Sequence, residues 1–211
     1  GEEVKGMAAY FARHRPDGIL LLGDRGEMLA AAIVAAHMNI PILHIGGGER
    51  SGTIDESIRH GITKFAHYHF TTTDSCKQRV IDMGEEPATV YRISAPGLDE
   101  IAAFKPKERE VLCKAAGFDP EKPVAMCLFH PVVQAAEQAG AQMRQLINAV
   151  MGHKALQCLL LEPNADAGNQ HIRTVINEAQ AAYGDRIKVV KHLPRGEYLS
   201  WLAQSDVLVG N

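Results

Sequence analysis

Three polar clusters in the first third of the chain carry residue types suited to acid–base chemistry and anion binding. The clusters are GDRGE at 23–27, HIGGGER at 44–50 and IDESIRH at 54–60. A carboxylate facing a cleft can remove or deliver a proton, and an arginine near a helix N-terminus can hold an anionic group. Each cluster lies beside an apolar strand or helix, at the edge where α/β proteins bind their ligands. The pattern predicts a polar ligand site at that edge.

Asp24 and Arg25 come between an apolar run and a helical pattern. One interpretation is a carboxylate for proton transfer beside a phosphate contact. The other is a helix N-cap aspartate with a surface arginine. Spacing alone does not separate these two interpretations.

The glycine run 46–48 follows a strand that ends near His44. Consecutive glycines allow a close backbone approach to a ligand, or positive φ angles. The run matches neither a P-loop nor a dinucleotide-binding fingerprint. His44 is either a strand histidine with a satisfied hydrogen bond, which is the commoner case, or a ligand contact.

The segment after this loop has a helix-start signal. Thr53 and Glu56 have the spacing of a capping box, as N-cap and N3 residues. Asp55 then falls in the first helical turn, where the helix dipole stabilises its charge. Arg59 follows four residues later and is positioned to pair with Asp55. The alternative is simply a well-capped surface helix.

Polar residues also end three strands of the second half. They are His130, the segment 162–169 with Asn164, and the pair His192 and Leu193. Each signal is weak alone. Together they line one edge of a second sheet, and a cleft with such polar edges suits a nucleotide-sugar.

Short apolar runs alternate with helical patterns along the whole chain. Strands are expected at 18–22, 41–45, 69–73, 90–93, 124–129, 156–161, 187–190 and 207–209. Helices are expected at 27–38, 54–67, 74–84, 138–151, 169–183 and 197–204. The pattern indicates an α/β protein with two Rossmann-like domains and parallel sheets, in which the strand at 18–22 is buried on both faces. We expect part of a first domain at 1–100, a proline-containing junction at 101–122, and part of a second domain at 123–211.

Composition narrows the possible classes of protein. The 211 residues are 46% hydrophobic and carry a net charge of −3, with no long basic block, so nucleic acid is not an expected partner. No apolar run is long enough to span a membrane. The cysteines are interpreted as reduced thiols of a cytosolic protein; they are Cys76, Cys113, Cys127 and Cys158. Glycine at position 1 and an apolar strand at the end suggest a piece of a longer protein, truncated at both ends.

Several segments together resemble the hydrolysing UDP-N-acetylglucosamine 2-epimerases of sialic-acid-type sugar synthesis. They are GDRGEMLAAAI, NIPILHIGGGERSGTIDESIRHGITKFAHYHF, FHPV, EPNADAGN and KHLPRGEYLSWLAQSDVLVGN. The resemblance implies a two-domain glycosyltransferase-B-like fold with the substrate in the interdomain cleft. It also implies the conversion of UDP-N-acetylglucosamine and water to N-acetylmannosamine and UDP, through elimination to a glycal and hydration. No metal or other cofactor is implied.

The resemblance also implies roles for individual residues. Asp24 and Asp55 match catalytic acid–base carboxylates, and Glu49 belongs to the matched Gly-Gly-Glu pattern. Substrate contacts are implied for Arg25, His44, His130, Asn164, His192 and Leu193, with His130 on the UDP phosphates and the backbone near Leu193 reading the uracil.

One departure from the family keeps alternatives open. Related enzymes often carry a glutamate at the position of Gly46, which cannot transfer a proton. Either Glu49 or His44 takes over, or the site is altered for a different sugar, or the protein is impaired. The leading hypothesis is a cytoplasmic homo-oligomeric (dimeric or tetrameric) UDP-N-acetylglucosamine 2-epimerase, of which this piece alone is inactive. The alternatives are the same reaction on a UDP-2,4-diacetamido-trideoxy sugar, a nucleotide-sugar-binding protein without turnover, and a retaining glycosyltransferase.

Overall fold

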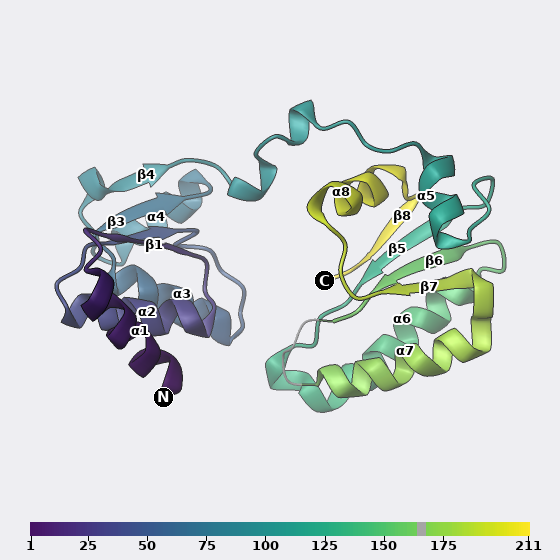
Figure 1. The fold of residues 1–211 in the computed structure, drawn as a ribbon, viewed down its shortest axis with the longest axis horizontal. Helices are drawn as coiled ribbons and strands as arrows, with labels where there is room; N and C mark the ends of the chain where they lie inside the picture. The colour runs from purple at the N-terminus through teal and green to yellow at the C-terminus, as the bar shows by residue number, and fades with distance from the viewer. Residues whose placement is uncertain (164–167) are drawn as a thin grey trace. The chain divides into compact units, whose positions relative to one another are not determined.

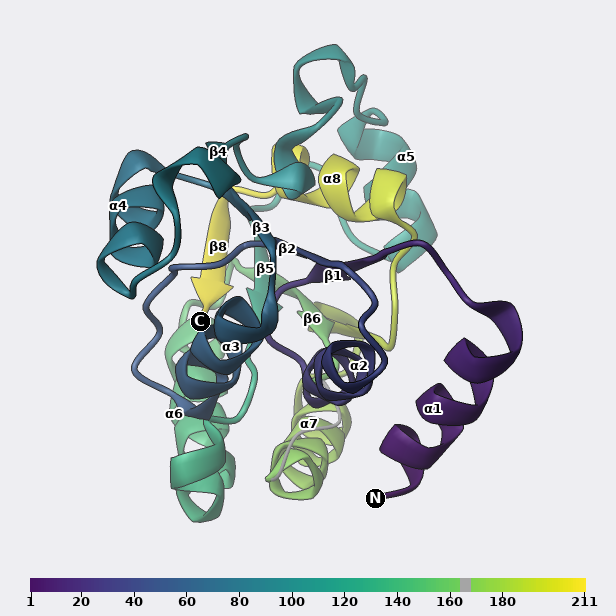
Figure 2. The ribbon, with the colours of Figure 1, turned by 90° about the vertical axis from the view of Figure 1, so that its left-hand side faces the viewer.

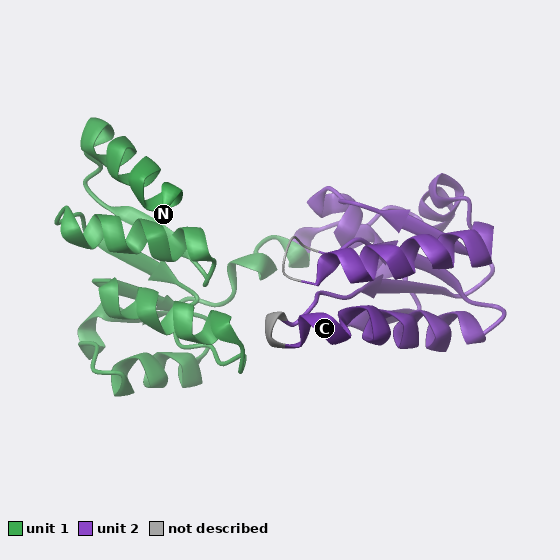
Figure 3. Cartoon of the chain, turned by 90° about the horizontal axis from the view of Figure 1, so that it is seen from below, with its two compact units in different colours: residues 1–102 green, residues 103–211 purple. Residues whose placement is uncertain are grey.

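The computed structural model describes residues 1–163 and 168–211, which divide into two compact units. Unit 1 spans residues 1–102 and unit 2 spans residues 103–211 (Figures 1 and 3). Each unit contains a four-stranded sheet in which every neighbouring pair of strands is parallel. The predicted α/β class with parallel sheets is therefore confirmed.

Unit 1 builds its sheet in the simple order β1-β2-β3-β4. The strands are β1 (Ile19–Leu22), β2 (Ile42–Ile45), β3 (Tyr68–Thr71) and β4 (Val90–Arg92). The helices are α1 (Glu2–His14), α2 (Gly26–His37), α3 (Ile54–Phe65) and α4 (Asp74–Asp82), with short 3-10 turns at Pro87–Thr89, Pro96–Leu98 and Ile101–Ala103. Because all four strands are parallel, their carboxyl ends meet at one edge of the sheet.

The core of unit 1 lies between its sheet and the helices α1, α2 and α3, which run along one side of it (Figures 1 and 2). Helix α2 presents a row of small side chains, so that Ala32 and Ala35 have no exposed surface against the sheet. Small residues let a helix approach a sheet closely, and the close packing excludes water from Leu21 and Ile42.

The opposite face of this sheet is open. Side chains alternate between the faces of a strand, so Leu20 and Leu22 point away from the helices and are 62% and 58% exposed. Tyr68 and Tyr91 on β3 and β4 are also exposed. The prediction that strand 18–22 is buried on both faces is wrong in this structure, because the described helices cover only one face.

Unit 2 has the strand order β7-β6-β5-β8. Strands β6 and β7 are added on one side of β5, and β8 is added on its other side. The strands are β5 (Val124–Leu128), β6 (Gln157–Leu161), β7 (Ile187–Val190) and β8 (Val207–Gly210). The helices are α5 (Arg109–Ala116), α6 (Ala139–Gly152), α7 (Asn169–Tyr183) and α8 (Arg195–Gln204), with 3-10 turns at Val133–Gln138 and Gly184–Arg186. This order is the first half of a doubly wound sheet.

Helices cover both faces of the unit 2 sheet (Figure 1). Alternate residues of β5 enter different cores: Ala125 and Cys127 pack with α6 and α7, whereas Val124 and Met126 pack with α5 and α8. Such two-sided burial explains why β5 reads as a continuous apolar run. All four cysteines of the chain are buried free thiols.

Two helices were not expected from the sequence. Helix α1 opens the chain, and α5 lies inside the segment 101–122 that was interpreted as a junction. Leu112 and Cys113 of α5 are buried in the core of unit 2, so this part of the segment belongs to a domain. Among the described residues, no helix combines the length and the hydropathy needed to cross a bilayer.

Candidate active site

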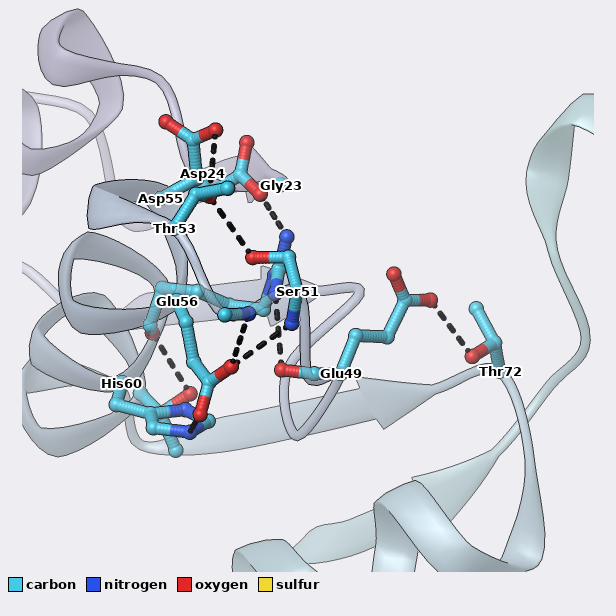
Figure 4. Close-up of polar contacts among 12 residues, drawn as sticks. Gly23, Asp24, Glu49, Ser51, Thr53, Asp55, Glu56, His60 and Thr72 are labelled. Carbon is cyan, nitrogen blue, oxygen red and sulfur yellow. Dashed lines mark hydrogen bonds and ion pairs between the residues drawn. The ribbon is translucent and has the colours of Figure 1, made fainter. Parts of the chain in front are cut away.

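The carboxyl edge of the unit 1 sheet gathers the predicted carboxylates from separate segments of the chain. Asp24 follows β1, Glu49 follows β2, and Asp55 lies in the first turn of α3 (Figure 4). Helix α2 begins at Gly26 with Arg25 as its N-cap residue, so the N-cap interpretation of Asp24 is wrong. Arg25 is exposed, and its Nε lies 3.5 Å from the Glu27 carboxylate.

The glycine run after β2 is explained by backbone packing. Gly46 and Gly48 have φ angles of +85° and +81°, in the left-handed region that favours glycine. A Cβ on Gly48 would lie 2.4 Å from the carbonyl oxygen of Cys76, a distance that the folded backbone cannot accept. Of the two predicted reasons for the run, positive φ is therefore observed. A side chain at position 46 would have room, but the positive φ angle there would strain the backbone of any residue other than glycine.

Arg59 on α3 joins two of the three segments. Its Nη2 is ion-paired with the carboxylate of Asp24, and its Nη1 donates a hydrogen bond of 2.8 Å to the carbonyl oxygen of Glu49. The Arg59 side chain is only 8% exposed and that of Asp24 is 23% exposed, so water screens this pair weakly. The predicted pairing of Arg59 with Asp55 is not the one formed, because Arg59 points into the site instead of along the helix surface.

Glu49 is held from both its backbone and its side chain. Its carbonyl accepts from Arg59, and its carboxylate accepts a hydrogen bond of 2.8 Å from the hydroxyl of Thr72 at the end of β3 (Figure 4). A half-buried carboxylate fixed in this way keeps one oxygen available for a ligand. The structure therefore gives Glu49, and not Gly46, a defined acidic position at this edge.

Asp55 is exposed, and one of its carboxylate oxygens accepts a hydrogen bond of 3.1 Å from the Thr53 hydroxyl. Thr53 is the N-cap residue as predicted, but the capping box is not formed. The Glu56 carboxylate instead accepts from the backbone N–H groups of Gly52 and Ser51, both at 2.8 Å. These two hydrogen bonds, Gly52 first, hold the pKa of Glu56 below its usual value.

His44 has no exposed surface. Its Nε2 lies 2.8 Å from the carbonyl oxygen of Gly23, and its Nδ1 lies 3.2 Å from the hydroxyl of Thr63. Burial lowers the pKa of His44, and the positive charges of nearby groups add to this effect. The satisfied strand histidine is the arrangement observed, and it leaves no imidazole surface for a substrate contact in this conformation.

In unit 2, the strand order places a topological switch point between β5 and β8, where doubly wound sheets bind their ligands. His130 follows β5 and Asn211 follows β8. The Asn211 side chain accepts from the His130 backbone N–H at 2.9 Å and donates to its carbonyl at 3.0 Å. A Cβ on Gly210 would lie 1.8 Å from the Leu128 carbonyl oxygen, so glycine is required for this approach.

The remaining predicted substrate contacts fall on the neighbouring strands. His192 and Leu193 lie between β7 and α8, with His192 exposed and Leu193 packed against the core of α5 and α8. Asn164 lies outside the described residues. Within residues 1–163 and 168–211, no group of three or more His, Cys, Asp or Glu side chains is placed to hold a metal ion.

Sequence reasoning missed Arg59 as a site residue, together with Thr63 and Thr72. The sequence contained a signal for Arg59 and Thr63, because their spacing places them on the same helix face as Ile62. All three residues are buried in the structure. An arginine on the buried face of an amphipathic helix needs a partner, which points to a carboxylate elsewhere in the fold. Thr72 gave no such signal, because only the strand pairing brings it to Glu49.

Comparison with known proteins agrees with this architecture. The sequence model of the UDP-N-acetylglucosamine 2-epimerase family matches residues 1–211. A UDP-N,N'-diacetylbacillosamine 2-epimerase (hydrolyzing) from Legionella pneumophila is 48% identical over 213 residues, covering all of this chain and 55% of that protein. A UDP-N-acetylglucosamine 2-epimerase from Neisseria meningitidis is 30% identical, covering 93% of this chain and 51% of that protein.

The fold has close counterparts among solved structures. The crystal structure of the Methanocaldococcus jannaschii UDP-GlcNAc 2-epimerase, in complex with UDP-GlcNAc and UDP, aligns with a TM-score of 0.81 at 14% identity, over 100% of this chain and 59% of that one. The predicted glycosyltransferase-B-like fold is confirmed, because the similar solved structures are UDP-GlcNAc 2-epimerases with this fold. The chain spans about half the length of the curated relatives it matches. Both the match of the family model over its whole length and the 48% identity place the chain in the UDP-N-acetylglucosamine 2-epimerase family.

Proposed function

We propose that the protein containing this chain is a hydrolysing 2-epimerase acting on a UDP-2,4-diacetamido-trideoxy sugar. The observation that carries the proposal is the set of carboxylates at one sheet edge, with Asp24 and Glu49 tied together by Arg59. The choice of sugar is supported by the 48% identity with the Legionella enzyme over the whole chain.

The proposed chemistry has two steps. In the first, a base removes the C2 proton while the bond from C1 to the UDP oxygen breaks, which leaves UDP and a glycal with a C1–C2 double bond. In the second, water adds its oxygen to C1 and a proton enters C2 from the opposite face. Two or more positioned carboxylates fit these steps, since a weakly acidic C–H needs a base and glycal hydration needs an acid. Asp24, Asp55 and Glu49 are the proposed acid–base groups.

UDP leaves as an anion, so the site needs groups that stabilise its developing charge. We assign this role to Arg25 in unit 1 and to the switch point of unit 2, where His130 follows β5. His192 and the backbone at Leu193 are proposed to contact the nucleotide. The homo-oligomeric state and the cytoplasmic location stay predictions.

The proposal is tested by proton NMR of the full-length protein with the UDP-diacetamido sugar in deuterated water. We expect free UDP together with the C2 epimer of the sugar, deuterated at C2. Asp24→Asn, Asp55→Asn and Glu49→Gln should each abolish UDP release, whereas Asp82→Asn, at an exposed position of α4, should not. Normal turnover of all three site variants would overturn the catalytic assignment.

UDP-N-acetylglucosamine is the second candidate substrate, favoured by the family description and by the Neisseria relative. Running the same NMR experiment with this sugar separates the two candidates by their relative rates of UDP release. UDP binding without release from either sugar would identify a nucleotide-sugar-binding protein instead. In that experiment His130→Ala should weaken UDP binding, and the exposed His153→Ala should serve as its control.

A further inference from the structure

The contacts of the buried His44 define which of its nitrogens carries the hydrogen. Its Nε2 lies 2.8 Å from the Gly23 carbonyl oxygen, which can only accept a hydrogen bond. Nε2 must therefore be protonated and must donate. Burial lowers the pKa of His44, which keeps the imidazole neutral. The neutral ring then has a bare Nδ1, which can only accept a hydrogen bond and lies 3.2 Å from the hydroxyl oxygen of Thr63.

Thr63 connects this histidine to the arginine of the site. Its hydroxyl also lies 3.0 Å from the carbonyl oxygen of Arg59, one turn earlier on α3, so its one hydrogen is shared between this oxygen and Nδ1 of His44. Arg59 in turn is ion-paired with Asp24. The contacts close a ring that runs from Asp24 to Arg59, to Thr63, to His44, to Gly23 and back along the backbone to Asp24.

The ring is enclosed by the glycine loop and by β3. A Cβ on Gly47 would lie 3.1 Å from the Thr63 hydroxyl and 3.2 Å from Nδ1 of His44, so the loop backbone packs directly over this pair. On the other side, His44 pairs in register with the buried His69 of β3. The Nε2 of His69 lies 3.3 Å from the carboxylate of Glu85, which also pairs with Lys64. The charged groups facing His44 are thus Asp24 and Arg59, and the titratable imidazole of His69 faces it from β3.

We propose that Thr63 and His44 are positioning residues for Asp24, which fix the turn after β1 and the helical turn that carries Arg59. The inference rests on the proposed function, in which Asp24 transfers a proton. Neither side chain has any exposed surface. They hold the Asp24 carboxylate and the Arg59 guanidinium in one geometry. A small displacement of a reacting group can lower the reaction rate strongly.

The kinetic test compares Thr63→Val with Thr63→Ser in the full-length protein. Valine keeps the shape of threonine and removes the hydroxyl, whereas serine keeps the hydroxyl. We expect Thr63→Val to lower kcat by about 10- to 100-fold with little change in KM, and Thr63→Ser to retain most of the wild-type kcat. Thermal unfolding of both variants confirms that they are folded. Equal kcat values for the two folded variants would overturn the proposal.

A spectroscopic test does not depend on turnover. In ¹⁵N-labelled protein, the His44 ring should show a protonated Nε2 and a bare Nδ1, and the Nδ1 resonance should shift in Thr63→Val but not in Thr63→Ser. A protonated Nδ1 with a bare Nε2 in the wild type would overturn the proposal, because the Gly23 contact requires the opposite tautomer. Failure of the proposed function is recognised separately, by normal turnover of Asp24→Asn.

Discussion

The guanidinium of Arg59 contacts the carboxylate of Asp24 although 35 residues separate them in the sequence. The pair brings together the turn after β1 and the second turn of α3, and the same guanidinium also holds the backbone of Glu49. Two proposed acid–base residues thus share one cation. A planar guanidinium serves two acceptors from separate nitrogens in fixed directions, whereas the three donors of an ammonium group rotate about a single nitrogen.

Arg59→Lys should therefore impair turnover even though the charge is kept. The lysine ammonium can pair with Asp24 or reach the Glu49 carbonyl, but its shorter reach and single centre do not hold both. We expect UDP release to fall by about 10- to 100-fold, as for other misplaced catalytic groups. Arg13→Lys, at an exposed position of α1, is the matched control. Wild-type rates in Arg59→Lys would show that charge alone is sufficient.

Thr72 is expected to orient Glu49. Thr72→Val removes the hydroxyl that lies 2.8 Å from the Glu49 carboxylate and preserves the side-chain volume. One hydrogen bond is worth about 1 kcal/mol, which corresponds to roughly a fivefold loss of turnover. Thr72→Ser should stay close to the wild type. If both variants show the same rate of UDP release, Glu49 does not depend on this contact.

The glycine loop offers a test by stability. Gly48 and Gly52 both have positive φ angles, +81° and +69°, but a Cβ at Gly48 meets Cys76 whereas nothing lies within 4 Å of one at Gly52. Gly52→Ala should lower the free energy of unfolding by about 1 kcal/mol, through backbone strain alone. Gly48→Ala adds a backbone clash and should cost more than about 3 kcal/mol in urea unfolding. Equal losses would mean that the loop adapts to the clash.

The buried histidines predict that acid destabilises unit 1. Burial lowers the pKa values of His44 and His69 below the ordinary histidine value of 6.5, so below that pH the unfolded chain binds more protons than the folded one. Stability should then fall as the pH drops below 6.5 toward the folded-state pKa values, by at most about 1.4 kcal/mol per pH unit for each histidine.

Urea unfolding at pH 7.5 and at pH 5.5 measures this loss. His69→Gln should reduce the difference between the two conditions, because it removes one of the two titrating groups. His153→Gln should leave the difference unchanged, since His153 is exposed. A stability that rises on acidification would contradict the assignment of neutral buried imidazoles.

The parallel sheets and most of their strands could be predicted because apolar runs such as 124–128 directly encode two-sided burial. The positions of Asp24 and Glu49 after strands, and of Asp55 at the start of a helix, could also be predicted from the local sequence. The partners of these residues did not follow, because Arg59 and Thr72 reach them through the order of strands in the sheet. Helix α5 was missed for a related reason. Its buried residues Leu112 and Cys113 do not form a recognisable helical pattern in the sequence, and their burial depends on the core that they share with α8.

The open face of the unit 1 sheet has a consequence for how the isolated 211 residues should behave in solution. A net charge of −3 gives modest mutual repulsion, while Leu20, Leu22, Tyr68 and Tyr91 expose apolar surface on this face. We therefore expect this face to contribute to the binding of hydrophobic dyes and to concentration-dependent self-association, in a unit whose other side is already densely packed.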